Sequence, residues 1–486
     1  MTCREVGEET GSVAEILRRT RGRHAQGGDA SGQGGDGARA MARASWLDAR
    51  RRVGRSRLAP EGRGATRLAV HRRGNEGPGV DTMVDLFPIQ LLFLLVLANR
   101  YIVGPLVRRV LGASFDLTVE GWEPTVAFVV PLFNEGRGIA DTIRSLLDQD
   151  YPPEKLSVVV VDDCSTDDSH AWACRAAAER PAAVTVLRAP RNQGKRAGIN
   201  VAVARTSAEI VVSVDSDVVV DRRAVRELVR RFATPRIAAV GGRTYVVNRD
   251  TNLLTRMIEV KFHFSQEWLK DLERACRSVV CLSGCLSAYR REVLVELEPI
   301  LARRNIAGVP IKYGEDRFLT QQILKAGHQT VFTPAAFCFT SAPTTLAGYF
   351  SQQLRWRRSN LVDFLGWATQ PWRIHPVVAI HYLTVLGLLA AYPVVVIDNL
   401  LEGQLWMVIV LHIGFVALLG LIYRCETRHL PPDRRVSILA FLPMALLMPV
   451  SYLVLTPLAL FTLDSSSWET RSGPSATRQE APARAA

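Results

Sequence analysis

Pairs of acidic residues directly follow two apolar stretches of this 486-residue chain. Asp162 and Asp163 come after the first stretch, and Asp215 and Asp217 come after the second. Each pair alone is explained at least as well by a turn or a helix N-cap as by a ligand-binding site, because Asp favours both of these structural positions. Two such pairs at neighbouring strand ends would repel one another unless a cation or a nucleobase donor engages them. Carboxylates as close in sequence as Asp215 and Asp217 suit Mg²⁺ or Mn²⁺, and they leave coordination positions for a diphosphate.

Polar residues also occur on two predicted helices further along the chain. Glu315 and Asp316 stand in the first turn of one helix, where the helix dipole stabilises acids whatever their function. Gln352, Arg355 and Trp356 share one face of the other helix, because they are spaced i, i+3 and i+4. An amide, a guanidinium and an indole presented together suit a sugar and a phosphate. The same trio suits an anchor at the lipid headgroups equally well, and the spacing leaves both interpretations open.

The elements that position these residues belong to an α/β domain. Between residues 126 and 245, apolar β-branched runs alternate with helical patterns. The runs are hydrophobic along their whole length, which indicates strands covered on both faces and a mostly parallel, Rossmann-like sheet. We expect strands at 126–130, 156–161, 184–187, 210–214 and 237–240, and helices at 139–149, 168–179, 195–205 and 222–232. Ligands of such sheets bind at the carboxyl ends of the strands, where the acids gather.

The glycine fingerprints of other nucleotide-binding α/β proteins do not follow the first predicted strand. Neither GxGxxG nor GxxxxGK[ST] occurs there. This pattern disfavours a dinucleotide site or a P-loop, and with them an oxidoreductase anchored to a membrane.

Four apolar stretches approach the roughly 20 residues that a helical membrane span requires. They are residues 86–107, 376–396, 405–423 and 438–463. Arginines flank the ends that face residues 110–372, whereas the loop at 398–402 is acidic, so the positive-inside rule places 110–372 in the cytosol. We therefore expect a multi-pass protein of the cell membrane with a cytosolic catalytic domain.

The fourth apolar stretch contains three prolines, Pro443, Pro449 and Pro457. Each costs about 3 kcal/mol in a regular helix interior. We expect a broken, interfacial or re-entrant helix here rather than a regular span. The resulting count of three or four crossings decides on which side of the membrane residues 464–486 lie.

Residues 1–82 differ from the rest of the chain in composition. They contain 16 arginines, no lysine, 10 acidic residues and 15 of the 35 glycines, which predicts a disordered tail. They also carry +6 of the net charge of +13. No aromatic interleaving or zinc-finger spacing accompanies the arginines, so the basic total does not indicate a nucleic-acid partner. A basic tail outside the membrane contradicts the positive-inside rule, and we interpret it as an over-extended start or an unstructured appendage.

Several motifs together resemble those of family 2 processive glycosyltransferases with a GT-A fold. They are DDCS at 162–165, DSD at 215–217, GEDR at 314–317 and QQLRW at 352–356, in that order. The segments SGCLSAYRR at 283–291 and SWETR at 467–471 are most similar to hyaluronan synthases, chitin synthases and nodulation N-acetylglucosaminyltransferases. Any one of these motifs is a weak signal, whereas their common order is specific.

The resemblance implies a role for each matching residue. It places Asp162, Asp163 and Lys195 at a uridine nucleotide, Asp215 and Asp217 on Mg²⁺ or Mn²⁺, and Asp316 as the general base, with Glu315 beside it at the substrate. It also implies that Gln352, Arg355 and Trp356 hold the acceptor end and the diphosphate, and that Trp468 and Arg471 close over the nucleotide. Glu469 stands where the family's WGTR element has glycine. Because that element acts on the cytosolic side, the resemblance favours three crossings.

The predicted organisation has six parts. They are a disordered tail at 1–82, a transmembrane helix at 83–110, a GT-A domain at 111–344, interfacial helices at 345–374, transmembrane or interfacial helices at 375–463 and a tail at 464–486. The resemblance implies an inverting enzyme that transfers N-acetylglucosamine from UDP-GlcNAc to a growing β-linked saccharide of the chitin-oligosaccharide type. Hyaluronan synthesis from UDP-GlcNAc and UDP-glucuronate is the alternative. In a non-catalytic alternative, a membrane-anchored binding protein, the acids would be turns and caps.

Overall fold

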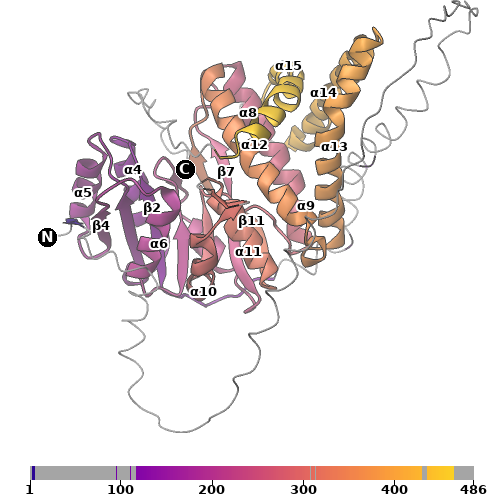
Figure 1. Cartoon of the computed structure of the whole chain (residues 1–486). Coiled ribbons are helices and arrows are strands. Elements are labelled where there is room, and N and C mark those ends of the chain that lie inside the picture. The colour runs from indigo at the N-terminus through magenta and orange to yellow at the C-terminus, as the bar shows by residue number, and fades with distance from the viewer. Residues whose placement is uncertain are drawn as a thin grey trace, which may run out of the picture. The chain divides into compact units, whose positions relative to one another are not determined.

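The structure is a computed structural model, which describes residues 117–464 apart from 307, 312 and 430–434 (Figure 1). It also describes the strand β1 (Cys3–Glu5) and residues 95 and 110. The predicted tail at 1–82 and the predicted span at 86–107 otherwise lie outside the described residues, as do Trp468 and Arg471. Three residues of the tail that we expect to be disordered thus form a strand, which pairs with β4 (Val184–Arg188).

A nine-stranded mixed sheet forms the centre of the described chain. In spatial order its strands are β1, β4, β3 (Leu156–Asp162), β2 (Val126–Leu132), β5 (Ile210–Ser213), β8 (Ser287–Arg290), β7 (Ile237–Val246), β11 (Gln329–Thr340) and β6 (Val219–Val220). The run from β1 to β5 is parallel, and so is the pair β7 and β11. Strand β8 is antiparallel to both of its neighbours, and β6 is antiparallel to β11. The sheet is therefore mostly parallel, as predicted.

Helices cover both faces of this sheet and create two hydrophobic cores (Figure 1). One core joins α4 (Gly138–Leu147), α5 (Ser169–Glu179) and α7 (Ala224–Val229) to side chains such as Phe128. The other core joins α6 (Lys195–Arg205), α10 (Arg291–Ala302) and α11 (Glu315–Lys325) to side chains such as Val129. Successive strand residues point to opposite faces, so a strand buried on both faces needs a continuous apolar run.

The predicted strands and helices of residues 126–245 are all present. Their ends differ from the prediction by up to three residues, except for β7, which continues to Val246 instead of ending at 240. The second half of β7 pairs with β11. This long-range partner has no local signal in the sequence of β7.

A second group of helices comes partly between β7 and β8 and partly after β11 in the chain. It contains α8 (Leu253–His263), a π-helical turn (Phe264–Leu269), α9 (Lys270–Ala275), α12 (Leu346–Ala368), α13 (Pro376–Leu401), α14 (Leu405–Glu426), α15 (Phe441–Val450) and α16 (Thr456–Phe461). Short 3-10 turns lie at Pro153–Lys155, Pro371–Arg373, Thr427–His429 and Ile438–Ala440, and β9 (Asn305–Ile306) and β10 (Val309–Pro310) form a small hairpin. A second π-helical turn, Ser451–Leu455, follows Pro449. Proline lacks an N–H donor, which accounts for the irregular helix.

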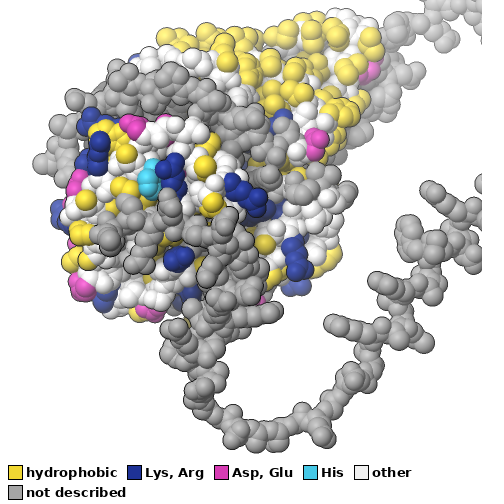
Figure 2. Space-filling view, turned by 60° about the vertical axis from the view of Figure 1, so that its left-hand side comes forward, with side chains coloured by type: hydrophobic (Ala, Val, Ile, Leu, Met, Phe, Trp, Pro, Cys, Tyr) yellow, Lys and Arg dark blue, Asp and Glu magenta, His cyan; other side chains and the backbone are white. Residues whose placement is uncertain are grey.

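Three helical segments are long and apolar enough to cross a membrane: Pro376–Leu401, Leu405–Glu426 and Ile438–Phe461. Large apolar side chains on them are exposed, including Leu401 at 81% and Phe461 at 83%. Figure 2 shows hydrophobic side chains gathered over these helices, whereas charged side chains are spread over the sheet domain. A contiguous apolar surface of this kind marks a membrane-associated protein.

Candidate active site

The acidic residues singled out in the sequence gather at the carboxyl ends of the parallel strands. Asp162 is the last residue of β3, and Asp163 follows it. Asp215 and Asp217 follow β5, which ends at Ser213. Strands β3 and β5 flank β2 and run parallel to it, so both acid pairs lie at the same edge of the sheet.

The two carboxylates of the first pair have different surroundings. Asp163 accepts hydrogen bonds from the backbone N–H groups of Gln193 and Gly194, both at 2.7 Å. Gly194 has a φ of 88°, which favours glycine, and it directly precedes Lys195 at the start of α6. Burial raises the pKa of Asp163, and these two hydrogen bonds partly oppose the rise. Asp163 therefore orders the loop that presents Lys195.

Asp162 is fully buried and binds neighbouring structural groups. It accepts a hydrogen bond from the backbone N–H of Ser165 at 2.9 Å. Its other oxygen lies 3.2 Å from His170 Nδ1 and 3.4 Å from Arg188 Nε. The structure thus gives Asp162 contacts that tie β3 to β4 and α5.

Lys195 connects two of the predicted site residues. Its Nζ lies 2.6 Å from Asp215 Oδ1 and 2.6 Å from Glu315 Oε1. The side chain is only 12% exposed. Burial alone would lower the pKa of Lys195, but Asp215, Glu315 and Asp316 together hold that pKa well above its usual range. The ammonium group is therefore charged and shared between α6, the end of β5 and α11.

Asp316 is partly buried in the first turn of α11. One carboxylate oxygen accepts a hydrogen bond from the backbone N–H of Arg317 at 2.8 Å, and the other from the backbone N–H of Gly284 at 3.4 Å. Burial raises the pKa of Asp316, and the negative charge of Glu315 raises it further, whereas Lys195 and Arg317 oppose the rise. A carboxylate with a raised pKa is suited to accept a proton near neutral pH.

Asp215 and Asp217 offer hard oxygen ligands for a divalent cation. The hydroxyl group of Thr340, at the end of β11, lies 3.5 Å from Asp217 Oδ2 and adds another oxygen at this edge. Among the described residues, no group of three or more His, Cys, Asp or Glu side chains could hold a metal ion. Asp215 and Asp217 alone thus offer at most two carboxylate ligands, which is a number that Mg²⁺ commonly takes from a protein.

Helix α12 carries the amide, guanidinium and indole that the sequence places on one face. Gln352 Oε1 and Arg355 Nε are buried atoms without a hydrogen-bond partner among the described residues. Trp356 is 37% exposed, and its ring centroid lies 6.2 Å from that of Phe262. Buried polar atoms in native proteins are nearly always paired, so these two atoms point to a polar ligand beside the indole.

Arg304 and Asp363 connect the loop before Asp316 to α12, and sequence reasoning missed both. The guanidinium of Arg304 donates to the carbonyl oxygens of Tyr313 at 2.5 Å and of Gly314 at 2.7 Å. It also lies 3.6 Å from Asp363 Oδ1 on α12, and the two side chains are 2% and 5% exposed. This buried pair fixes the entry to α11 relative to the helix that carries Gln352.

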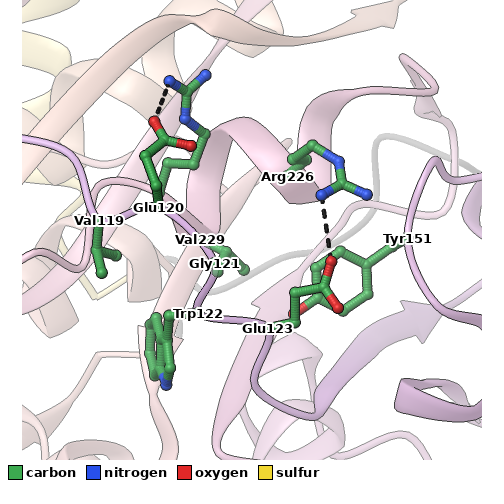
Figure 3. Close-up of a pocket in the computed structure, with 9 residues that line it drawn as sticks. Val119, Glu120, Gly121, Trp122, Glu123, Tyr151, Arg226 and Val229 are labelled. Atoms are coloured by element: carbon green, nitrogen blue, oxygen red, sulfur yellow. Dashed lines mark hydrogen bonds and ion pairs between the residues drawn. The ribbon is translucent and has the colours of Figure 1, made fainter.

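A cavity of about 150 Å³ lies at the opposite, amino end of β2. Glu123 and Tyr151 line it, and Arg226 Nη1 lies 3.3 Å from Glu123 Oε1 (Figure 3). Arg230 Nη2 lies 2.6 Å from Glu120 Oε1, and the Tyr151 hydroxyl donates to a backbone carbonyl at 2.7 Å. These two ion pairs, Arg226 with Glu123 and Arg230 with Glu120, connect residues 119–123 to α7 and its C-terminal end.

The predicted residues therefore fall into three groups. One group surrounds Lys195 and consists of Asp215, Glu315 and Asp316. Asp163 binds the loop that precedes Lys195, and Asp217 lies beside Thr340. Gln352, Arg355 and Trp356 lie on α12, which is joined to the first group through Asp363 and Arg304. Asp162 binds structural neighbours, and Trp468 and Arg471 lie outside the described residues.

Comparisons with known proteins identify the family of this chain. A family model described as glycosyltransferase like family 2 matches residues 124–359. An N-acetylglucosaminyltransferase of Azorhizobium caulinodans is 32% identical over 362 residues, which cover 72% of this chain and 87% of the relative. A hyaluronan synthase of Streptococcus pyogenes is 28% identical over 426 residues, which cover 80% of this chain and 97% of the relative.

One solved structure shares the fold. The mannosyltransferase PcManGT from Pyrobaculum calidifontis, in complex with GDP-Man and Mn²⁺, has a TM-score of 0.50 and 22% sequence identity. The alignment covers 74% of this chain and 98% of that one. At this identity the likeness shows the fold alone.

Proposed function

Because the chain belongs to the family 2 glycosyltransferases, we propose that it transfers N-acetylglucosamine from UDP-GlcNAc to a growing β-linked saccharide. It is a membrane-associated glycosyltransferase with a GT-A fold. The relative named N-acetylglucosaminyltransferase supports the choice of sugar. The observation that carries the proposal is the meeting of Asp215, Glu315 and Asp316 around Lys195 at the carboxyl ends of the strands.

In this proposal the partly buried carboxylate of Asp316 is the general base. It accepts the proton of an acceptor hydroxyl as that oxygen attacks C1 of the donor sugar from the face opposite the diphosphate. The attack forms the new glycosidic bond, breaks the bond to the diphosphate and inverts the anomeric carbon. The raised pKa of Asp316 suits this proton transfer at neutral pH.

The charged residues around Asp316 would bind the donor. Asp215 and Asp217 would hold Mg²⁺ or Mn²⁺, which when bound neutralises negative charge on the leaving diphosphate. Lys195 would contact the same diphosphate, and Asp163 would position the loop at the nucleotide. Two backbone N–H groups hold Asp163 in place, and Thr340 lies beside Asp217, which favours binding by preorganised charge at these two positions.

Helix α12 would bind the acceptor end of the saccharide. Trp356 offers an aromatic face for a sugar ring, and Gln352 and Arg355 each offer a buried atom without a partner among the described residues. The ion pair of Arg304 with Asp363 would keep this platform at a fixed distance from Asp316.

The proposal includes a catalytic domain in the cytosol and three crossings of the cell membrane. Helix α13 begins beside the sheet domain, where the backbone N–H of His375 donates to Ser278 Oγ at 3.2 Å. Helix α14 ends beside α8, where Glu426 Oε2 lies 3.3 Å from His263 Nε2. The predicted span at 86–107 would provide the first crossing, and the hairpin of α13 and α14 would provide the other two.

The segment Ile438–Phe461 would then lie along the interface. Near its start, the ring centroid of Phe441 lies 6.5 Å from that of Phe264, directly after α8, and its end contacts the sheet domain. There the Tyr313 hydroxyl donates to the backbone carbonyl of Leu463 at 2.8 Å. Because Tyr313 precedes Gly314 of the GEDR motif, the tail with Trp468 and Arg471 would start near the donor site.

Labelled donors test the enzymatic proposal. Membranes that contain the full chain are incubated with labelled UDP-GlcNAc and Mn²⁺, with and without UDP-glucuronate, and the polymer is measured. We expect incorporation from UDP-GlcNAc alone. A requirement for both donors would indicate hyaluronan synthesis, which the Streptococcus pyogenes relative makes the second candidate. No incorporation from either donor would contradict the proposal.

Thiol labelling tests the proposed topology. Ser466 is replaced by cysteine, and intact cells are treated with an impermeant thiol reagent. Because the chain has other cysteines, the parent protein is labelled in parallel as the control. We expect no additional label until the cells are opened. Labelling of Ser466→Cys in intact cells would favour four crossings.

A further inference from the structure

Lys195 is the cation that contacts two of the clustered carboxylates in the described part of the chain. Its Nζ lies 2.6 Å from Asp215 and 2.6 Å from Glu315, and the side chain is 12% exposed. Buried carboxylates are strongly destabilised unless a positive charge compensates them. The ammonium group of Lys195 provides this charge when no donor is bound.

Gly284 leaves the space that the ammonium group needs. A Cβ atom at Gly284 would lie 2.6 Å from Lys195 Nζ and 3.5 Å from both carboxylate oxygens of Asp215. The backbone of Gly284 is not in the left-handed region that favours glycine, so space alone explains the residue here. The contact between Lys195 and Asp215 is thus accommodated by a second, distant segment of the chain.

We propose that Lys195 is a tethered counter-ion that competes with the divalent cation for Asp215 and is released from it when a diphosphate binds. This inference rests on the proposed function, because it takes Asp215 as a metal ligand. It goes further in assigning Lys195 a role before the donor is present.

The charges at the site explain this competition. A divalent cation bound to Asp215 would lie next to the ammonium group that already holds the same carboxylate, and the two positive charges repel. The diphosphate of the donor offers the ammonium group a new partner, while Glu315 keeps it nearby. Metal and nucleotide should therefore bind with positive coupling, each strengthening the other by the same factor.

Mn²⁺ binding measures this coupling without any turnover. The full-length protein in lipid nanodiscs is titrated with Mn²⁺, with and without UDP, and free Mn²⁺ is followed by electron paramagnetic resonance. In Lys195→Met we expect Mn²⁺ to bind about tenfold more tightly without UDP, within the usual range of coupling factors. The tightening of Mn²⁺ binding by UDP should shrink in the same variant.

Gly284→Ala provides an independent variant with every charge retained. The new methyl group would push Nζ away from Asp215 while the flexible lysine side chain adjusts. We expect tighter Mn²⁺ binding without UDP here too, by a smaller factor. Lys155→Met is the matched control, because Lys155 pairs at 3.5 Å with Glu123 at the other end of the sheet, and it should leave Mn²⁺ binding unchanged.

Asp215→Asn separates a failure of this inference from a failure of the proposed function. If Asp215→Asn weakens Mn²⁺ binding but Lys195→Met and Gly284→Ala bind Mn²⁺ no more tightly than the parent, Lys195 does not compete and the inference is overturned. If Asp215→Asn binds Mn²⁺ as tightly as the parent, the metal-ligand assignment in the proposed function is wrong, and the inference falls with it.

Discussion

Charged residues gather at both ends of the sheet, but they differ in burial and in what they bind. At the carboxyl end, the side chains of Lys195 and Glu315 are 12% and 15% exposed. At the amino end, those of Arg226 and Glu123 are 41% and 33% exposed. Exposed pairs contribute little and are screened by solvent, whereas buried charges carry a desolvation cost that favourable geometry must offset. The buried cluster is therefore the one whose retention needs a functional explanation.

Buried polar atoms without a hydrogen-bond partner among the described residues occur at both ends. At the amino end, Arg226 and Arg230 pair with nearby acids and the Tyr151 hydroxyl has a backbone acceptor, but Arg230 Nε is such an unpaired atom. At the carboxyl end, Gln352 Oε1 and Arg355 Nε on the neighbouring helix have no hydrogen-bond partner among the described residues. Neither charge nor unpaired polar atoms thus separate the two ends, and the lower exposure of Lys195 and Glu315 is what distinguishes the carboxyl end.

Among substitutions at the two ends of the sheet, Asp316→Asn should cause the largest loss of sugar transfer. Asparagine cannot accept the proton of the acceptor hydroxyl, and general-base catalysis typically contributes about 10²- to 10⁴-fold. We expect sugar transfer to fall by that factor while UDP binding is retained. Initial rates with labelled UDP-GlcNAc and calorimetric UDP binding measure the two quantities, and parent-like turnover would remove Asp316 from the proposed role.

The sequence predicts the carboxyl-end acids because their signal is local. A strand buried on both faces, such as Val126–Leu132, is recognised from one continuous apolar run, and acids after neighbouring parallel strands must then share an edge. Strand β11 is harder to recognise. Pro334 interrupts its ladder, and its register with β7 shifts between Thr333 and Phe337.

Contacts between distant segments explain what the sequence could not predict at the site. Gly284 leaves space for the side chain of Lys195, which comes from α6. The guanidinium of Arg304 contacts Tyr313, Gly314 and Asp363. No spacing rule links these positions. The contacts of Asp162 with His170 and Arg188 are likewise formed by the fold, and its assignment to the nucleotide stays a prediction.

Arg304→Met should have the next largest effect. The variant removes both hydrogen bonds to the loop before Asp316 and leaves the Asp363 carboxylate buried without its ion pair. A displacement of about 1 Å at a reacting group can cost on the order of 10²-fold in rate. We expect kcat to fall by about that factor with KM for UDP-GlcNAc nearly unchanged.

Arg304→Lys provides the conservative comparison for this positioning role. Lysine keeps one positive charge but lacks the planar fork that reaches two carbonyl oxygens, so we expect partial rescue of kcat. Arg303→Met is the matched control from the neighbouring exposed position. Equal losses in Arg304→Met and Arg304→Lys, both explained by lower protein yield, would indicate a purely structural role.

Glu315→Gln tests the electrostatics of the buried cluster through pH dependence. Burial, followed by the charge of Glu315, raises the pKa of Asp316, and a general base is inactive once protonated. Transfer should therefore be lost as pH falls through this raised pKa. Removing the charge of Glu315 should move the acid limb of kcat/KM to lower pH, while an unchanged limb would contradict the assignment of that limb to Asp316.

Removing the ion pair of Arg226 with Glu123 at the amino end should have the smallest effect on sugar transfer. Glu123→Gln and Arg226→Met are measured singly and together, and the coupling in free energy of unfolding should stay below about 1 kcal/mol, because the pair is partly exposed. Transfer from UDP-GlcNAc should stay within about twofold of the parent, since an exposed pair far from the acids contributes only this small stability term. A large loss of transfer with an unchanged free energy of unfolding would mean that this ion pair influences the opposite edge of the sheet. Exposure would then no longer separate the two ends, because a partly exposed group of charges would also control the reaction.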